Sequence, residues 1–326
     1  MNDDLLRRIP IRDAARRLEG VVRRTPLAPF SVPDVRVELR LKLECLQETG
    51  AFKARGAWNQ IALLSERERA AGVVTVSSGN HGKAVAWAAQ RTGIRATIVM
   101  PANAYPNKIA ACREFGAEVL LGETRAAAER LCAERVAAGA TLVHPYDAER
   151  TLQGAGTVGL EIAEDWPELE VLVVPVGGGG LLAGSALAIR QTLGRRVLVV
   201  GVEPEGAPSM KLSLEQGRAV TLERITTQVQ GLCPPGAGRL NTEICGLAVD
   251  AIVTLPDEDI FAAQRELVLR GGWTVEPAGA AAYAAVLAGK LPTLVTHART
   301  PDNRVRIACV VSGGNPDPAQ IAAIRA

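Results

Sequence analysis

The sequence has few histidines and no paired cysteines, and these shortages exclude several kinds of metal and redox site. Only three of its 326 residues are histidines, none at the spacing of paired metal ligands. A zinc site built on histidine, and catalysis by metal-bound water with it, is therefore not expected. The six cysteines show no CxxC spacing, which argues against a structural zinc site and a disulfide framework. We expect reduced cysteines, most of them buried.

The sequence also lacks a long apolar segment and an excess of charge of either sign. Its longest apolar run, residues 278–289, is too short to cross a bilayer, and the N-terminus has no apolar core like that of a signal peptide. The 37 basic residues nearly balance the 35 acidic ones, which leaves a net charge of +2 and no basic surface for nucleic acid or a membrane. We predict a cytoplasmic protein that acts on a small molecule.

Short apolar runs alternate with alanine-rich helical segments along most of the chain. Four such runs follow one another at regular intervals between residues 72 and 144, as in a parallel sheet with crossover helices. The runs after Tyr146 are apolar throughout, which is typical of strands buried on both faces. We predict an α/β fold of two domains, each an open, mostly parallel sheet flanked by helices. Residues 1–66 and 149–326 would form the large domain, and residues 67–148 a small domain that closes over the substrate.

The segment GAFKARGA, residues 50–57, places Lys53 where a helix is expected to begin. The positive end of a helix disfavours an ammonium group and favours the neutral amine. A lowered pKa is what a lysine needs to attack a carbonyl group. Taken alone, however, this residue is more simply explained as a solvated surface lysine.

A glycine-rich loop, VPVGGGGLLAG, follows a buried strand and opens a helix. It contains four consecutive glycines: Gly177, Gly178, Gly179 and Gly180. Their backbone amides and the helix N-terminus predict a site for an anion, most simply a phosphate. With Glu203 after the next strand, this order also resembles a nicotinamide dinucleotide site. The GxGxxG spacing is absent, because Gly184 lies one residue too far along the chain. That alternative leaves GAFKARGA unexplained.

Two further loops carry polar groups at strand ends. The loop SSGNHG, residues 77–82, lies between a strand and a helix, where its side chains and the helix amides suit either carboxylate binding or helix capping. Taken alone it favours capping, and His81 is assigned no catalytic role. The loop VVSGGN, residues 310–315, ends a buried strand near the C-terminus and supplies Ser312. By itself it is compatible with any turn.

Together these motifs resemble the fold-type II enzymes that use pyridoxal 5′-phosphate, which share the fold of the tryptophan synthase β subunit. Within them they resemble the serine/threonine dehydratase and serine racemase family, from RTPL at residues 24–27 to SGGN at residues 312–315. The resemblance implies that Lys53 forms the Schiff base with the cofactor and acts as the base, with Phe52 packed beside it. It also implies that the four glycines bind the phosphate and that Ser312 contacts the pyridine nitrogen. A neutral serine there favours prompt loss of a β-substituent over long-lived carbanion chemistry.

The same resemblance assigns the substrate carboxylate to residues of SSGNHG, namely Ser77, Ser78, Asn80 and His81. It implies that Asn80 also contacts the cofactor and that Glu276 lies near it. In racemases Ser78 would be the second proton donor, on the face opposite Lys53. Because serine stands at this position in racemases and in some dehydratases, its presence permits racemisation without deciding for it.

Two departures from the family pattern affect the expected chemistry. Glu203 and Ala207 match a cation site of the family, but Ser209 stands where an aspartate is usual, so a bound cation is doubtful. In the segment at residues 226–240, Gln230 replaces an acidic residue near the expected position of the substrate side chain. This replacement indicates a nonstandard substrate.

The resemblance predicts dehydration and deamination of a hydroxy amino acid, such as L-threonine or L-serine, to a 2-keto acid and ammonia. An amino-acid racemase of the serine type is the alternative, and a nicotinamide-dependent oxidoreductase is a distant one. Members of the family are commonly dimers, so the resemblance also implies a homodimer.

Overall fold

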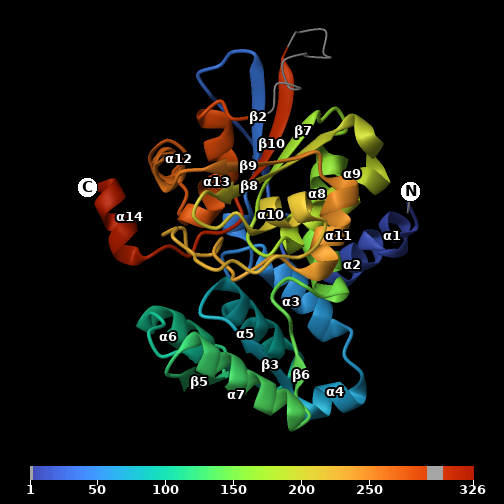
Figure 1. The fold of residues 1–326 in the computed structure, drawn as a ribbon, viewed down its shortest axis with the longest axis vertical. Coiled ribbons are helices and arrows are strands. Elements are labelled where there is room, and N and C mark those ends of the chain that lie inside the picture. The colour runs from blue at the N-terminus through green and yellow to red at the C-terminus, as the bar shows by residue number, and fades with distance from the viewer. Residues whose placement is uncertain (1–2, 292–303) are drawn as a thin grey trace.

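The computed structural model describes residues 3–291 and 304–326 and contains two β-sheets (Figure 1). The larger sheet has the strand order β1-β2-β10-β7-β8-β9. Its strands are β1 (Leu27–Phe30), β2 (Val37–Lys42), β7 (Val171–Pro175), β8 (Leu198–Pro204), β9 (Ala251–Leu255) and β10 (Val305–Val310). All neighbouring strands are parallel except β1, which pairs with β2 in the antiparallel direction.

Helices cover both faces of this sheet, and β7 shows why its strands are apolar throughout. Leu172 and Val174 pack into the core beneath α8 (Glu149–Asp165) and α9 (Gly180–Thr192). The alternate residues Val171 and Val173 belong to the core on the other face, with α12 (Asp257–Leu269) and α13 (Pro277–Leu287). Successive strand residues point to opposite faces, so a strand buried on both faces needs apolar residues at every position.

The smaller sheet lies below the larger one in Figure 1 and is parallel throughout. Its strands, in the order β5-β4-β3-β6, are β3 (Val73–Val76), β4 (Ala96–Pro101), β5 (Glu118–Gly122) and β6 (Thr141–Leu142). Helices α5 (Asn80–Thr92) and α6 (Pro106–Glu114) flank it, together with α7 (Arg125–Ala137). The predicted α/β class with two mostly parallel sheets is confirmed, whereas the predicted domain boundaries stay a prediction.

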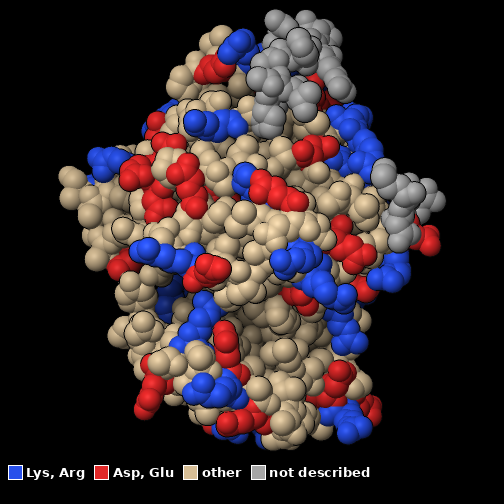
Figure 2. Space-filling view, viewed as in Figure 1, with Lys and Arg blue, Asp and Glu red and all other residues tan. Residues whose placement is uncertain are grey.

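Helix α3 (Lys53–Ala62) packs against α5, and its apolar residues join the core of the smaller sheet. The remaining helices are α1 (Asp3–Arg8), α2 (Ile11–Leu18), α4 (Glu66–Ala71), α10 (Ser209–Gln216), α11 (Arg239–Ala248) and α14 (Pro318–Arg325), with short 3₁₀ turns η1 (Glu44–Leu46) and η2 (Gly194–Arg196). None of the helices within residues 3–291 and 304–326 is long and apolar enough to span a membrane. Acidic and basic side chains are interspersed over the face seen in Figure 2, as the balanced charge predicts.

Candidate active site

Lys53 is the first residue of α3, as the sequence predicts. Its Nζ donates a hydrogen bond of 2.7 Å to the carbonyl oxygen of Pro145 and lies 5.0 Å from the centre of the Phe52 ring. Burial lowers the pKa of this amine from 10.5 to about 8, because desolvation disfavours the charged form. Lys53 therefore has a substantial neutral fraction at mildly alkaline pH.

Ser312 lies directly beside this segment. The backbone amide of Phe52 donates to the Ser312 carbonyl oxygen at 3.1 Å, and Ala51 pairs with Gly313 in an isolated antiparallel bridge. The Ser312 side chain is 5% exposed, and its hydroxyl reaches the Ala278 carbonyl only at 3.4 Å. This long contact leaves the hydroxyl able to make a better hydrogen bond to a bound molecule.

The four glycines form the turn between β7 and α9. No described group accepts a hydrogen bond from the amides of Gly177, Gly178 or Gly179, which stand at the N-terminus of α9. A Cβ atom on Gly178 would lie 2.3 Å from the Tyr146 ring, and Gly179 has a φ of +90° that side chains rarely adopt. Glycine is thus required here for steric reasons. The free amides and the helix dipole favour an anion.

Residues 145–147 connect the lysine to the glycine turn. The Pro145 carbonyl holds Lys53, while the Asn241 amide donates to the carbonyl oxygens of Tyr146 at 3.1 Å and Gly178 at 2.8 Å. Asp147 accepts hydrogen bonds from two backbone amides at the start of α11. Hydrogen bonds through residues 145–147 and Asn241 therefore link the Lys53 amine to the glycine turn.

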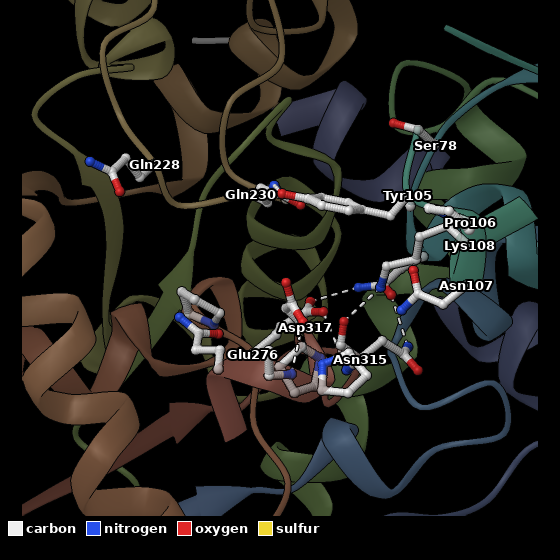
Figure 3. A pocket seen from close by; sticks show the side chains of 18 of the residues that line it. Ser78, Tyr105, Pro106, Asn107, Lys108, Gln228, Gln230, Glu276, Asn315 and Asp317 are labelled. Atoms are coloured by element: carbon white, nitrogen blue, oxygen red, sulfur yellow. Dashed lines mark hydrogen bonds between the residues drawn. The ribbon is translucent and has the colours of Figure 1, made fainter. Parts of the chain in front are cut away.

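Asn80 and Glu276 meet across the space between the two sheets. Asn80 Nδ2 donates to Glu276 Oε1 at 2.6 Å, and Asn315 Nδ2 donates to Asn80 Oδ1 at 2.8 Å. Burial raises the pKa of Glu276, against the effect of Lys108 and the hydrogen bond from Asn80. Lys108 in turn donates to the Asn315 carbonyl at 2.6 Å (Figure 3). The sequence motif SGGN contains Asn315 but gave no sign of this role.

The loop SSGNHG lies at the start of α5. Ser77 accepts a hydrogen bond from the Gly79 amide, and Ser78 is exposed. His81 is buried, and burial lowers its pKa to about 3, so the ring is neutral. Because its Nε2 contacts the Val143 carbonyl at 2.9 Å, that nitrogen carries the proton and Nδ1 is only an acceptor. Donors for a carboxylate here are therefore the hydroxyls, the Asn80 amide and the α5 backbone amides.

A cavity of about 780 Å³ is lined by this loop, by the start of α6 and by residues of the segments 227–231 and 315–320. Its lining includes Ser78, Asn80 and Glu276 together with Tyr105 and Gln230. Lys53 and the glycine turn are not among the lining residues. Nothing in the local sequence singles out Tyr105 chemically, since it only precedes a helix-starting proline.

Glu203, Ala207 and Ser209 lie together, but their polar groups are already hydrogen-bonded. The Glu203 carboxylate accepts from the amides of Met210 at 2.7 Å and Lys211 at 2.9 Å at the start of α10, and the Ala207 carbonyl accepts from the Ser209 amide. Burial raises the pKa of Glu203 to about 7. Among the described residues no cluster of three or more His, Cys, Asp or Glu could hold a metal ion. The cation site stays a prediction, and this donor set does not favour it.

Pyridoxal 5′-phosphate, the cofactor that the resemblance implies, fits the residues described above. Its aldehyde suits an amine with a lowered pKa, such as Lys53, and its phosphate suits the uncommitted amides at the start of α9. The Ser312 hydroxyl is available to its ring nitrogen. The residues predicted from the sequence therefore form a set whose chemistry matches the parts of this cofactor.

Comparisons with known proteins agree with this match. The family model described as pyridoxal-phosphate dependent enzyme matches residues 18–313. The chain is 44% identical over 314 residues to an L-threonine ammonia-lyase of Thermotoga maritima, covering 94% of this chain and 75% of the relative. It is 38% identical to a phenylserine dehydratase of Ralstonia pickettii, covering 94% and 92%. The structure of maize serine racemase superposes with a TM-score of 0.87 at 34% identity, covering 96% and 94%. The chain therefore belongs to the fold-type II pyridoxal-phosphate-dependent enzymes, in the family of serine/threonine dehydratases and serine racemases.

Proposed function

We propose that this protein dehydrates and deaminates a hydroxy amino acid of the L-threonine or L-serine type to a 2-keto acid and ammonia. The observation that carries the proposal is the buried Lys53 amine, whose pKa is lowered to about 8 and which donates a hydrogen bond to the Pro145 carbonyl. The residue before it, Phe52, is hydrogen-bonded through its backbone to Ser312. Relatives named L-threonine ammonia-lyase, at 44% and 38% identity, support the reaction class.

Each group of the site has a part in this proposal. When bound, pyridoxal phosphate holds the substrate amino group and accepts the electrons released at the α-carbon. The Lys53 amine, neutral in part near pH 8, takes the α-proton. The glycine-turn amides hold the phosphate, and the SSGNHG loop with the α5 N-terminus holds the substrate carboxylate. Loss of water from the substrate and hydrolysis of the resulting enamine give the keto acid and ammonia.

Ser312 favours prompt loss of a β-substituent over long-lived carbanion chemistry. It is a neutral hydroxyl, so it offers the ring nitrogen a hydrogen bond rather than the ion pair of a carboxylate. A ring without that ion pair stabilises a carbanion less, which favours prompt departure of the β-hydroxyl. The racemase alternative retains support from Ser78, whose exposed side chain lines the cavity, and from the likeness to maize serine racemase. The family match leaves no support for a nicotinamide-dependent oxidoreductase.

From the resemblance we also propose a homodimer and the division into a large domain, residues 1–66 and 149–326, and a small domain, residues 67–148. Sedimentation velocity tests the dimer, because a monomer of 34.3 kDa and its dimer sediment at clearly different rates. Limited proteolysis tests the boundaries, since cleavage is expected near them first.

The product assay tests the proposed reaction. Protein supplied with pyridoxal phosphate is incubated with L-serine and L-threonine, and keto acid and ammonia are measured. We expect equal amounts of the two products, with a loss of about 10²–10⁴-fold in kcat for Lys53→Ala, the range for removal of a general base. Lys290→Ala, at an exposed lysine outside the site, is the matched control and should behave as wild type. Unchanged activity of Lys53→Ala would contradict the role of this amine.

A further inference from the structure

The cavity beside the site is larger than a small substrate needs. It continues from Ser78 and Asn80 to Tyr105 and Gln230 and has a volume of about 780 Å³. Cavities that enclose much larger ligands measure roughly 300–1,000 Å³. The substituents on the β-carbon of serine or threonine are at most a hydroxyl and a methyl group. They would fill only a small part of this cavity.

Tyr105 forms part of the wall of the cavity. It is the N-cap residue of α6, and Pro106 at the first position of that helix restricts the backbone there. At the other end of the side chain, Gln230 Nε2 donates to Tyr105 Oη at 3.2 Å. Figure 3 shows the ring reaching from α6 toward Gln230, and the residue is 48% exposed. An aromatic face held at both ends is thus open to the cavity.

The loop that carries Gln230 is itself held firmly. Asp257, in the first turn of α12, accepts hydrogen bonds of 2.6 Å from the Thr227 hydroxyl and from the backbone amide of Gln228. Val229 is fully buried beneath the loop. Gln230 is therefore projected over the cavity by a short, anchored segment, with its amide directed at Tyr105.

The charged groups that line the cavity already have partners. Glu276 accepts from Asn80, and Lys108 donates to the Asn315 carbonyl. Asp317 caps α14 by accepting from the Ala319 amide. Apart from Lys108, which follows Tyr105 in the first turn of α6, the lining also includes uncharged residues: Pro106, Gln228, Gln230, Gly231 and Phe261. Because the charged groups are already hydrogen-bonded within the protein, they compensate poorly for the desolvation of a charged substituent.

We propose that the part of the cavity beside Tyr105 and Gln230 receives an uncharged aromatic β-substituent, so that the substrate class is 3-aryl-3-hydroxy amino acids. The Tyr105 ring is the selective surface, and Gln230 holds it in place. Aromatic rings pair favourably in offset or edge-to-face contact, and a ring also benefits from leaving water. This inference rests on the proposed dehydration and deamination.

The test compares three substrates on the protein supplied with pyridoxal phosphate: threo-3-phenyl-L-serine, L-threonine and L-serine. Keto acid formation gives kcat/KM for wild type, Tyr105→Ala, Tyr105→Phe and Gln230→Asp. Ile225→Ala is the control, because this side chain is exposed nearby but does not line the cavity.

We expect phenylserine to be the preferred substrate. Tyr105→Ala should lower kcat/KM for phenylserine by roughly tenfold or more, as for loss of a ring contact, and for L-serine by less than about threefold. Tyr105→Phe keeps the ring and should retain most of the preference. Gln230→Asp should reduce the phenylserine rate more than the serine rate, because it places a carboxylate beside an apolar ring. Ile225→Ala should match wild type.

The outcomes separate this inference from the proposed function. Turnover of L-serine and L-threonine without turnover of phenylserine would overturn the inference and leave the proposed function intact. Equal losses for phenylserine and serine in both Tyr105→Ala and Gln230→Asp would also overturn it. Keto acid from none of the three substrates would overturn the proposed function itself.

Discussion

The properties of Lys53 follow from its place in the chain. Lys53 lies in the segment at residues 50–57 and is the first residue of α3. The fold buries its amine against Pro145 and Phe52. Desolvation then disfavours the ammonium form, which lowers the pKa to about 8. The sequence predicted the direction of this shift from the helix N-terminus, but the burial that causes it depends on the tertiary structure.

The rate at which cofactor-free protein takes up pyridoxal phosphate should depend on the ionisation of Lys53. The amine reacts when neutral, and its neutral fraction rises with pH through the pKa of about 8 and is nearly complete above it. We therefore expect the uptake rate, followed by absorbance, to rise with pH to a midpoint near 8 and then level off. A rate that keeps rising toward pH 10.5, the ordinary value for lysine, would contradict the lowered pKa.

Tyr105 and Asn315 show why parts of the site could not be predicted. Tyr105 meets Gln230, which is 125 positions away, and Asn315 meets Asn80, which is 235 positions away. Neither pairing produces a pattern in the nearby sequence, because both contacts depend on how the two sheets are placed. The motifs that were predicted are local ones, in which a strand end, a turn and a helix start lie next to each other in the sequence.

At the scale of elements, the sequence predicted the buried parallel strands well and missed β1. Continuous apolar runs predicted β7, β8 and β10, because burial on both faces demands apolar residues. Strand β1 has only four residues and includes Pro29, which is unfavourable for most strand positions. It forms at the edge of the sheet, where it pairs with β2 alone.

Close packing of α8 against α9 fixes the helix that carries the glycine turn, and Gly184 makes this packing possible. A Cβ atom at Gly184 would lie 2.5 Å from the Leu152 carbonyl oxygen and 2.7 Å from the Gly156 amide nitrogen. Gly184→Ala should therefore lower the free energy of unfolding by about 1–3 kcal/mol, the usual cost of overpacking. The affinity of the Gly184→Ala variant for pyridoxal phosphate should also fall, because α9 carries the glycine turn. Denaturant unfolding and cofactor titration measure the two effects.

Gly246 in α11 provides the matched control for this substitution. An added Cβ there would meet only the Leu214 side chain, at an ordinary 3.9 Å. Gly246→Ala should raise the free energy of unfolding by about 0.5–1 kcal/mol through helix propensity. Equal destabilisation by both substitutions would contradict the assignment of close helix packing to Gly184.

At the scale of the whole molecule, a buried charge network ties together segments that are distant in the sequence. Arg55 in α3 forms ion pairs with Glu44 at 2.8 Å and with Glu161 of α8 at 2.6 Å, and Lys42 of β2 also binds Glu161. Arg55, Glu44 and Lys42 have fully buried side chains. The two positive and two negative charges balance, which limits the cost of burying them.

Breaking this network should destabilise the protein strongly. Arg55→Leu leaves the Glu44 carboxylate buried without its main partner, and we expect a loss of about 3–5 kcal/mol in the free energy of unfolding. Arg125→Leu removes an exposed pair with Glu129 and should cost at most about 1 kcal/mol. Guanidinium unfolding of both variants measures the difference. Similar losses in the free energy of unfolding would show that the buried network contributes no more to stability than an exposed ion pair.

The measurement that tests the account most directly is the partition of L-serine between two products. Protein supplied with pyridoxal phosphate is given L-serine, and pyruvate, ammonia and D-serine are quantified in the same samples. Dehydration predicts pyruvate and ammonia in equal amounts, with D-serine at most a minor product. Accumulation of D-serine without pyruvate would contradict the account and make the protein a racemase.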